Sequence, residues 1–260
     1  MTSHTARSVV GTIVVSVGVA CLAFGVSAQD EGTLLSVEIV SVIPDRMDDY
    51  VELQTQIVSP ALQRAGVPWR AVWRTADFGN TYDLQLVRPL GGLAELDAGG
   101  PLARVMDPDR LKHLVDQLRR CTVSRRSYAT QYREDLSVLA DDVGDMFLAR
   151  QTTIHVAPGR VGEWEGFLRR GVPTFREAGV VFGVYHRLLG PDPTSWLIVE
   201  NLGSFTELTR PDIIGHTFGE QADVVPQELA GVVTSIGRAV LRYDTQLSYS
   251  GIPSREAETR

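Results

Sequence analysis

Apolar and polar positions divide the chain into strands and helices. Residues 34–43 are rich in β-branched side chains and end at Pro44-Asp45, which predicts a strand followed by a turn. A helix is predicted next, because apolar residues recur there at a spacing of 3.6 residues: Met47, Tyr50, Leu53, Ile57 and Ala61. Gly66 stands where a helix end takes a left-handed residue, and Pro60 is expected to kink the helix or break its last turn.

The same order of elements is predicted twice along the chain. In the first half, two strands (69–75 and 82–87), a helix (107–119) and a last strand (123–132) follow. The second half repeats the order, with a strand at 146–156, a helix at 161–175, strands at 182–188 and 196–200, a helix from 225–229 onward and a strand at 233–243. The helix at 161–175 has the same spacing of apolar residues as the first, contains Pro173 and ends before Gly179. The sequence Gly190-Pro191-Asp192-Pro193 predicts a tight turn between the middle strands of this half. Each half therefore predicts the order β-α-β-β-α-β.

Short identities recur between the halves at a nearly constant spacing. Pro44 and Arg46 recur 114 residues later as Pro158 and Arg160. At a spacing of 113, Ala65-Gly66-Val67 recurs as Ala178-Gly179-Val180, and Arg74 recurs as Arg187. Later identities follow at 112 and then 111, so the spacing changes by one residue at a time. We interpret this as the duplication of one unit, with boundaries at 33–137, an acidic linker at 138–145 and a second unit at 146–250.

This organisation resembles the dimeric α/β-barrel superfamily in its fused, tandem form. The order β-α-β-β-α-β is the ferredoxin-like arrangement, whose sheet has helices on one face and leaves the other bare. The resemblance, which rests on the element order, the repeated Pro-x-Arg turn and the repeated Ala-Gly-Val, implies an α+β fold: two tandem ferredoxin-like βαββαβ units packed sheet to sheet as a pseudo-dimeric α/β barrel. The superfamily includes haem-dependent dismutases and peroxidases, cofactor-free monooxygenases, lyases and proteins without known chemistry, so the fold alone does not select an activity.

The N-terminus predicts export. Residues 1–28 have one charge at Arg7, then an uncharged stretch that ends in Val26-Ser27-Ala28, the layout of a cleaved signal peptide. We expect a mature chain that begins at Gln29, in the periplasm or outside the cell, with no membrane attachment after cleavage. An uncleaved anchor and a lipoprotein attached through Cys21 are the alternatives. The tail 251–260 is charged and polar, and we expect it to be disordered.

Composition and motifs limit the classes of partner and function that the chain is expected to have. The chain has 25 basic and 32 acidic residues and a net charge of −7, which disfavours nucleic acid as a partner. After signal cleavage Cys121 is the only cysteine, so no intrachain disulfide can form. Hydrolases and nucleotide-binding proteins are disfavoured because no Gly-x-Ser-x-Gly elbow or phosphate-binding glycine loop occurs. One chain can complete its own barrel, so both a monomer and a homo-oligomer are compatible with the sequence.

We expect no metal and no cofactor, haem included. The resemblance implies that fused haem-dependent members hold iron through a histidine on a helix of their second unit. The corresponding helix here, 160–178, has no histidine, and His155, His186 and His216 do not match that position. The sequence also lacks the HxH, HxxxH and CxxC spacings of common metal sites.

Polar residues on the predicted strands are the candidates for a binding site. Alternation along 69–75 separates an apolar row, Trp69, Ala71 and Trp73, from a row that contains Arg70 and Arg74. We expect the apolar row to lie under the helices and the polar row to face the space between the two sheets. The predicted ligand-binding residues of that space are Arg74, Arg150, Tyr185, Arg187 and Glu38, since guanidinium groups suit a small anionic or phenolic ligand. Alternatively, Glu38 pairs with these arginines across the interface.

Three functions are compatible with these residues. The leading hypothesis is an exported protein that binds a small apolar or weakly anionic molecule between its sheets, without catalysis. The second is a cofactor-free monooxygenase or lyase-type enzyme, with His186 or His155 as the catalytic base and an arginine that stabilises an enolate or phenolate. The third is a structural or interaction module whose cavity is filled by side chains.

Overall fold

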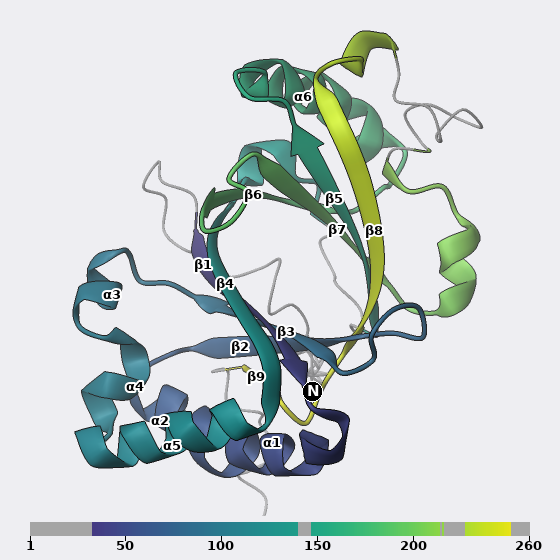
Figure 1. The fold of residues 1–260 in the computed structure, drawn as a ribbon. Helices are drawn as coiled ribbons and strands as arrows, with labels where there is room; N and C mark the ends of the chain where they lie inside the picture. The colour runs from purple at the N-terminus through teal and green to yellow at the C-terminus, as the bar shows by residue number, and fades with distance from the viewer. Residues whose placement is uncertain (1–32, 140–146, 214, 216–226, 251–260) are drawn as a thin grey trace, which may run out of the picture.

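Eight antiparallel strands of the described residues close into a barrel, with helices packed on the outside (Figure 1). The computed structural model describes residues 33–139, 147–213, 215 and 227–250. The predicted signal peptide with Cys21, most of the linker, His216, Val225 and the predicted tail lie outside the described residues. The strands are β1 (Leu34–Val42), β2 (Trp69–Thr75), β3 (Asp83–Pro89), β4 (Thr122–Tyr132), β5 (Leu148–Val156), β6 (Gly183–Leu189), β7 (Ser195–Leu202) and β8 (Val233–Tyr243), with a short β9 (Tyr249–Ser250) at the edge of β2. All eight barrel strands lie within two residues of their predicted ranges.

Pairing within each half follows the same plan. The sheet order is β3-β1-β4-β6-β7-β5-β8-β2, and β2 also pairs with β3, which closes the ring. In each half the first strand is central and lies between the third and the fourth, and the second strand lies beyond the third. Two short seams join the halves. Between β4 and β6 the register runs from Ala129 with Leu189 to Tyr132 with Tyr185, and between β2 and β8 from Trp73 with Tyr243 to Thr75 with Leu241.

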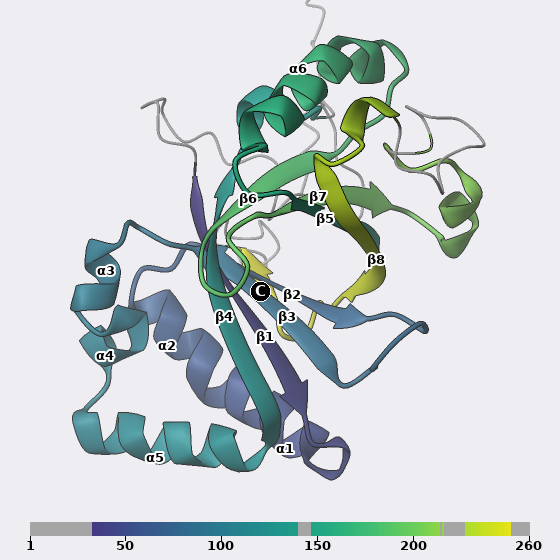
Figure 2. The same cartoon turned by 45° about the horizontal axis from the view of Figure 1, so that its top comes forward.

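Helices cover opposite sides of the barrel in the two halves, as Figure 2 shows. The first half has α1 (Met47–Leu53), α2 (Ser59–Arg64), α3 (Ala94–Asp97), α4 (Gly100–Val105) and α5 (Pro108–Arg120), and the second half has α6 (Val161–Glu177). The predicted helix from Val225 onward is represented among the described residues by the 3-10 turn Gln227–Leu229. Gly66 and Gly179 have φ of 80° and 69°, which confirms the two predicted helix ends.

A π-helical segment joins α1 to α2 without breaking the helix. It spans Gln54–Val58 and ends two residues before Pro60. The expected kink at Pro60 is therefore replaced by a local widening of the helix, and α6 continues past Pro173 to Glu177. The first-half helix begins 114 residues before the start of α6 and ends 113 residues before the end of α6. It is therefore one residue longer than α6, and the π-helical segment holds the additional residue.

Most of the barrel strands are buried on both faces. The interior is filled by one apolar cluster: Leu35, Val37, Trp69, Ala71, Trp73, Val87, Tyr128, Ala149, Tyr185, Leu197 and Leu241. Outside, Trp164, Phe175 and Trp196 belong to the core beneath α6, and Tyr50 and Val72 belong to the core beneath α1. Strands such as β2 and β5 thus separate two cores, whereas β4 is exposed at 123–127 and β8 at 234–235 and 237–238.

The predicted facing of the strands is right for β6 and wrong for β2. Tyr185 lies in the barrel interior and Val184 under α6, as expected. On β2, Trp69, Ala71 and Trp73 lie inside the barrel, whereas Val72 packs under the helices. Because both rows of β2 are buried, polarity does not distinguish the face that points inward.

Candidate functional site

The barrel interior, where the sequence placed the binding site, is nearly filled. Its cavity has a volume of about 40 Å³, whereas small-molecule pockets usually measure about 300–1,000 Å³. Two of its polar groups are hydrogen-bonded: the Gln85 amide donates to Gln151 at 3.1 Å, and the Thr130 hydroxyl donates to the His186 carbonyl at 2.8 Å. The hydroxyls of Tyr128 and Tyr132, which belong to or pack against the interior cluster, are buried with no hydrogen-bond partner among the described residues. This interior has room for a few water molecules.

Two of the predicted ligand-binding residues lie in or beside the interior. Tyr185 lines the small cavity, and its ring centroid is 5.4 Å from that of Tyr132. The Arg187 guanidinium lies 4.0 Å from the centroid of the Tyr128 ring, a cation–π contact, and donates to the Pro191 carbonyl at 3.1 Å.

The predicted inward orientation of the other three is wrong. Arg74 is paired with Asp244, and Glu38 accepts from Arg125 at 2.7 Å on the outside of the barrel. Arg150 is also outside, where it binds both carboxylate oxygens of Glu200 at 2.9 Å. Glu38 is thus paired, but not with the arginines that the sequence analysis proposed. The physical reason is the same as for β2, since β1 and β5 are covered on both faces.

Of the two candidate catalytic bases, His186 lies outside the interior. Its imidazole is stacked on Trp196, with the ring centroids 4.3 Å apart and the planes 11° apart. Burial lowers the pKa of His186, so the ring is neutral at pH 7, while a backbone hydrogen bond at Pro193 opposes this shift.

His155 is held by the turn between β6 and β7. Its Nδ1 lies 2.6 Å from Oδ2 of Asp192, and the Thr194 hydroxyl donates to the other carboxylate oxygen at 3.0 Å. Asp192 adopts a left-handed φ of 65°, which aims its carboxylate back across the turn. Since Arg187 bonds the neighbouring residue Pro191, an imidazole and a guanidinium hold the same turn.

A buried arginine that the sequence analysis assigned to the other face is the most unusual charged group of the described residues. Arg70, on β2, is 3% exposed and points toward the helix of the first half. Its guanidinium donates to Oε1 of Gln54 at 2.7 Å and to the Ser59 hydroxyl at 3.2 Å. Both acceptors are neutral, and no carboxylate of the described residues forms an ion pair with it. Burial lowers the pKa of Arg70, the direction expected for a desolvated cation.

Two tyrosines complete what we call the Arg70 cluster: Arg70, Tyr50, Gln54, Ser59 and Tyr249. Tyr249 pairs with Arg70 across β9 and β2, and its hydroxyl is buried with no hydrogen-bond partner among the described residues. Burial raises the pKa of Tyr249 to about 12 and also raises that of Tyr50, which is 1% exposed. Both phenols are therefore protonated at neutral pH and can donate hydrogen bonds.

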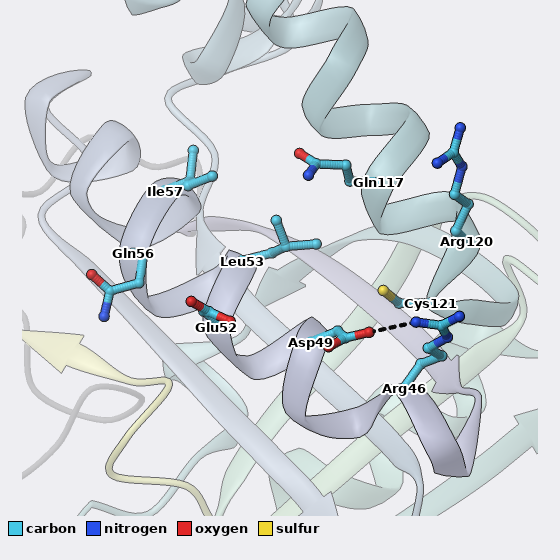
Figure 3. Close-up of a pocket in the computed structure, with 9 residues that line it drawn as sticks. All are labelled: Arg46, Asp49, Glu52, Leu53, Gln56, Ile57, Gln117, Arg120 and Cys121. Atoms are coloured by element: carbon cyan, nitrogen blue, oxygen red, sulfur yellow. Dashed lines mark hydrogen bonds and ion pairs between the residues drawn. The ribbon is translucent and has the colours of Figure 1, made fainter.

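A separate cleft opens on the surface between α1 with its π-helical segment and α5 (Figure 3). Its volume is about 470 Å³, within the range of small-molecule sites. Leu53, Ile57 and the 4% exposed Cys121 line it, and charged and amide side chains surround them. Burial raises the pKa of the Cys121 thiol, so it is a poor nucleophile at neutral pH.

Comparison with known proteins identifies the fold. No protein-family model matches the chain, and no curated protein sequence matches it. The structure is similar to an anthrone oxidase-like protein, with a TM-score of 0.59 and 13% identity over 85% of this chain and 94% of that one. It is also similar to a candidate monooxygenase from Lactobacillus acidophilus NCFM, with a TM-score of 0.53 and 12% identity over 85% and 97% of the two chains. Chlorite dismutase from Candidatus Nitrospira defluvii matches with a TM-score of 0.51 and 10% identity over 84% and 93%. The protein has the dimeric α/β-barrel fold, as the sequence resemblance predicted.

The expectation of no cofactor, haem included, is overturned by these comparisons. Chlorite dismutase has this fold, and the resemblance described above counts haem-dependent dismutases among the proteins of the superfamily. The lack of a histidine on one helix was too narrow a reason to exclude haem from such a fold.

The described side chains beneath α6 do not fit haem in their present arrangement. Trp164, Phe175 and Trp196 fill that space, and His186 is stacked on Trp196 at its edge. Among the described residues, the buried polar atoms without a partner in that layer include the two indole N–H groups, which are donors and cannot ligate iron, and the Thr152 hydroxyl, which is not a haem ligand of the usual kinds.

Two kinds of site are absent from the described part of the chain. No group of three or more histidine, cysteine or carboxylate side chains is placed to hold a metal ion there. In the same residues, no helix has the length and apolar character needed to span a bilayer.

Replacing each of the two buried arginines is expected to change the free energy of unfolding by a different amount. Arg150→Met leaves Glu200 buried without its partner and is expected to lower the free energy of unfolding by about 3–5 kcal/mol. Arg70→Met removes a buried charge that has only neutral partners, so we expect a change within about 1 kcal/mol in either direction. Urea unfolding followed by tryptophan fluorescence measures both, and equal losses would contradict the assignment of Arg70 as uncompensated.

His186 predicts a pH dependence of stability. Its folded pKa is lower than the unfolded value of about 6.5, so the unfolded state binds more protons as the pH falls between these two values. The stability contributed by neutral His186 is therefore complete above about pH 6.5 and is lost as the pH falls through the folded pKa. His186→Phe keeps a stacked ring but cannot titrate, so its unfolding free energy should fall less between about pH 7.5 and 5.5 than that of the wild type. The exposed His113→Gln variant is the control and should behave as the wild type.

Proposed function

We propose that the protein binds a small apolar molecule with an acidic group, and that the Arg70 cluster holds the acid between the first-half sheet and its helix. The observation that carries this proposal is the guanidinium of Arg70, which is 3% exposed and has only neutral acceptors among the described residues. The proposal keeps the type of ligand expected from the sequence but moves it out of the barrel interior, which is nearly filled.

The argument rests on the cost of burying a charge. Transfer of an ion out of water costs several kcal/mol unless a counter-charge compensates it. The second half supplies that counter-charge, since Glu200 binds Arg150 through two hydrogen bonds. In the first half the hydrogen-bond acceptors of Arg70 are an amide and a hydroxyl, and Glu38, the carboxylate whose charge favours the Arg70 cation, is itself paired with Arg125. A bound carboxylate or phenolate would provide the missing negative charge where desolvation makes the interaction strong.

The surroundings suit the rest of such a ligand. Tyr249 has a buried hydroxyl without a partner in the described part of the chain, and this hydroxyl can donate to an oxyanion. Its ring packs against an apolar cluster between β2 and the helices, formed by Val58, Leu62, Val67 and Leu114. An oxyanion at Arg70 would therefore have apolar side chains beside it, as expected for a weak organic acid rather than an inorganic ion.

A second candidate function is catalysis of the monooxygenase or lyase type. The structural neighbours include candidate monooxygenases and an anthrone oxidase-like protein, although at 12–14% identity the likeness concerns the fold. The specific observation in its favour is the His155 imidazole, oriented by Asp192 on a turn that Arg187 also binds. An imidazole held by a carboxylate is the usual arrangement of a general base.

Export and the tandem organisation are part of the proposal. We infer that residues 1–28 are removed, and Gln29 should be the first residue of the protein recovered from the periplasm or medium; Met1 at that position would contradict cleavage. The halves are proposed to be two ferredoxin-like units, in line with their common strand order. Reassembly of the barrel from two fragments separated within 138–145 tests that division.

The binding proposal is tested with benzoate and its neutral analogue benzamide. Benzoate is expected to raise the melting temperature by about 2–4 °C per kcal/mol of binding free energy gained, and benzamide to have little effect. Arg70→Met should abolish the response to benzoate, whereas Arg126→Met, which removes an exposed arginine of β4, should retain it. Equal responses to the two compounds, or an unchanged response in Arg70→Met, would contradict the proposal. Oxygen uptake that is lost in His155→Gln would instead support the second candidate.

A further inference from the structure

The cleft between α1 and α5 is independent of the Arg70 cluster, although both adjoin the same helix. The π-helical segment directs Gln54 inward to Arg70, while Gln56 and Ile57 line the cleft on its other side (Figure 3). A ligand in this cleft would therefore meet a different set of side chains. No group of the Arg70 cluster is among the described residues that line it.

The charges that surround the cleft are mostly paired, and the pairing leaves one charge on each wall. On the α1 wall, Asp49 is paired with Arg46 at 2.8 Å, while the Glu52 carboxylate has no ion pair within the described residues. On the α5 wall, Asp116 is paired with both Lys112 and Arg119, and the Arg120 guanidinium likewise has no ion pair in that part of the chain. The cleft thus offers an anion on one wall and a cation on the other.

Besides these charges and the Asp49–Arg46 ion pair, the groups that line the cleft are apolar or amide. Leu53, Ile57 and Cys121 give an apolar surface, and Gln56 and Gln117 each present an amide that both donates and accepts hydrogen bonds. A complementary ligand has an ammonium group, a carboxylate, an apolar side chain and a polar amide between them. These are the features of a short peptide with free ends.

We propose that this cleft binds a short zwitterionic peptide of about dipeptide size. Its N-terminal ammonium pairs with Glu52, its C-terminal carboxylate pairs with Arg120, and its side chain lies on Leu53 and Ile57. The volume of about 470 Å³ is within the range of pockets that enclose small ligands.

Three related peptides test the two ends separately. Leucyl-alanine has both charges, N-acetyl-leucyl-alanine lacks the ammonium, and leucyl-alanine amide lacks the carboxylate. Calorimetric titration of the whole mature protein should give the tightest binding for leucyl-alanine, with each blocked peptide about five- to tenfold weaker. Equal binding of the three peptides, or no binding of leucyl-alanine at millimolar concentration, would overturn the proposal.

Matched variants assign each end to its residue. Glu52→Gln should weaken the binding of leucyl-alanine about five- to tenfold without further weakening the binding of N-acetyl-leucyl-alanine. Arg120→Gln should weaken the binding of leucyl-alanine by a similar factor without further weakening the binding of leucyl-alanine amide. The controls are Asp48→Asn and Arg119→Gln, exposed residues of the same helices that do not line the cleft. Losses of the same size in the controls would overturn the assignment.

Cys121 gives a second readout that does not depend on calorimetry. Because its side chain lines the cleft, bound leucyl-alanine should slow its alkylation by iodoacetamide, measured by mass spectrometry on the peptide that contains it and at alkaline pH, where more of the thiol is ionised. Arg70→Met should leave this protection unchanged, which separates a failure of the peptide site from a failure of acid binding. An alkylation rate that is the same with and without saturating peptide would count against the site.

Discussion

Closure of the barrel at two short seams is the constraint on which the rest of the structure depends. Each half has a sheet with one apolar face, which includes Leu35 and Val37 in the first half and Ala149 and Leu197 in the second. Neither face is covered within its own half, so the pairs β4–β6 and β2–β8 must form for both to be buried. The merged faces fill the interior with side chains and leave a cavity of about 40 Å³. Polar chemistry is consequently displaced to the layer between the sheet and the helices.

The two halves use that outer layer differently. In the second half, Arg150 is neutralised by Glu200 and also donates to the carbonyls of Arg210 and Pro211, so the segment after β7 is tied to the sheet. In the first half, Arg70 occupies a comparable buried position with neutral partners. A common strand order thus supports one half whose buried charge is satisfied internally and one whose buried charge is compatible with an external partner.

Much of the fold could be predicted from the sequence, but the orientation of its strands could not. β-branched runs and turn residues defined strands such as 69–75 and 233–243, because local patterns determine where a strand begins and ends. The inward face of β2 was assigned wrongly, since Trp69 and Arg70 are both buried and only closure of the barrel decides which points inward. The sequence analysis also treated Arg74 and Arg187 as equivalent positions, but only Arg187 lies beside the barrel interior. Positions that face the barrel interior, such as Ala71 and Tyr185, are separated by 114 residues and not 113.

The candidate site was harder to predict because its parts are distant in the sequence. Arg70 meets Gln54 from a π-helical segment and Tyr249 from the last described strand, and no local pattern indicates either contact. One signal was present: a run of otherwise buried apolar residues, Trp69-Arg70-Ala71-Val72-Trp73, contains a charged residue at its second position. Tyr185 was placed correctly because the two rows of β6 differ clearly in polarity near the interior.

The π-helical segment makes the helix of the first half differ from that of the second. Its additional residue leaves the start and end of the helix at their equivalent turns, so the helix still covers the same side of its sheet. In a helix each residue adds a rotation of about 100°, and an extra residue therefore turns the side chains around it toward new neighbours. Gln54 then reaches Arg70, and Gln56 and Ile57 reach the surface cleft, whereas α6 lacks such a segment. One additional residue is thus sufficient to give two halves of common strand order different buried contacts and different helix surfaces.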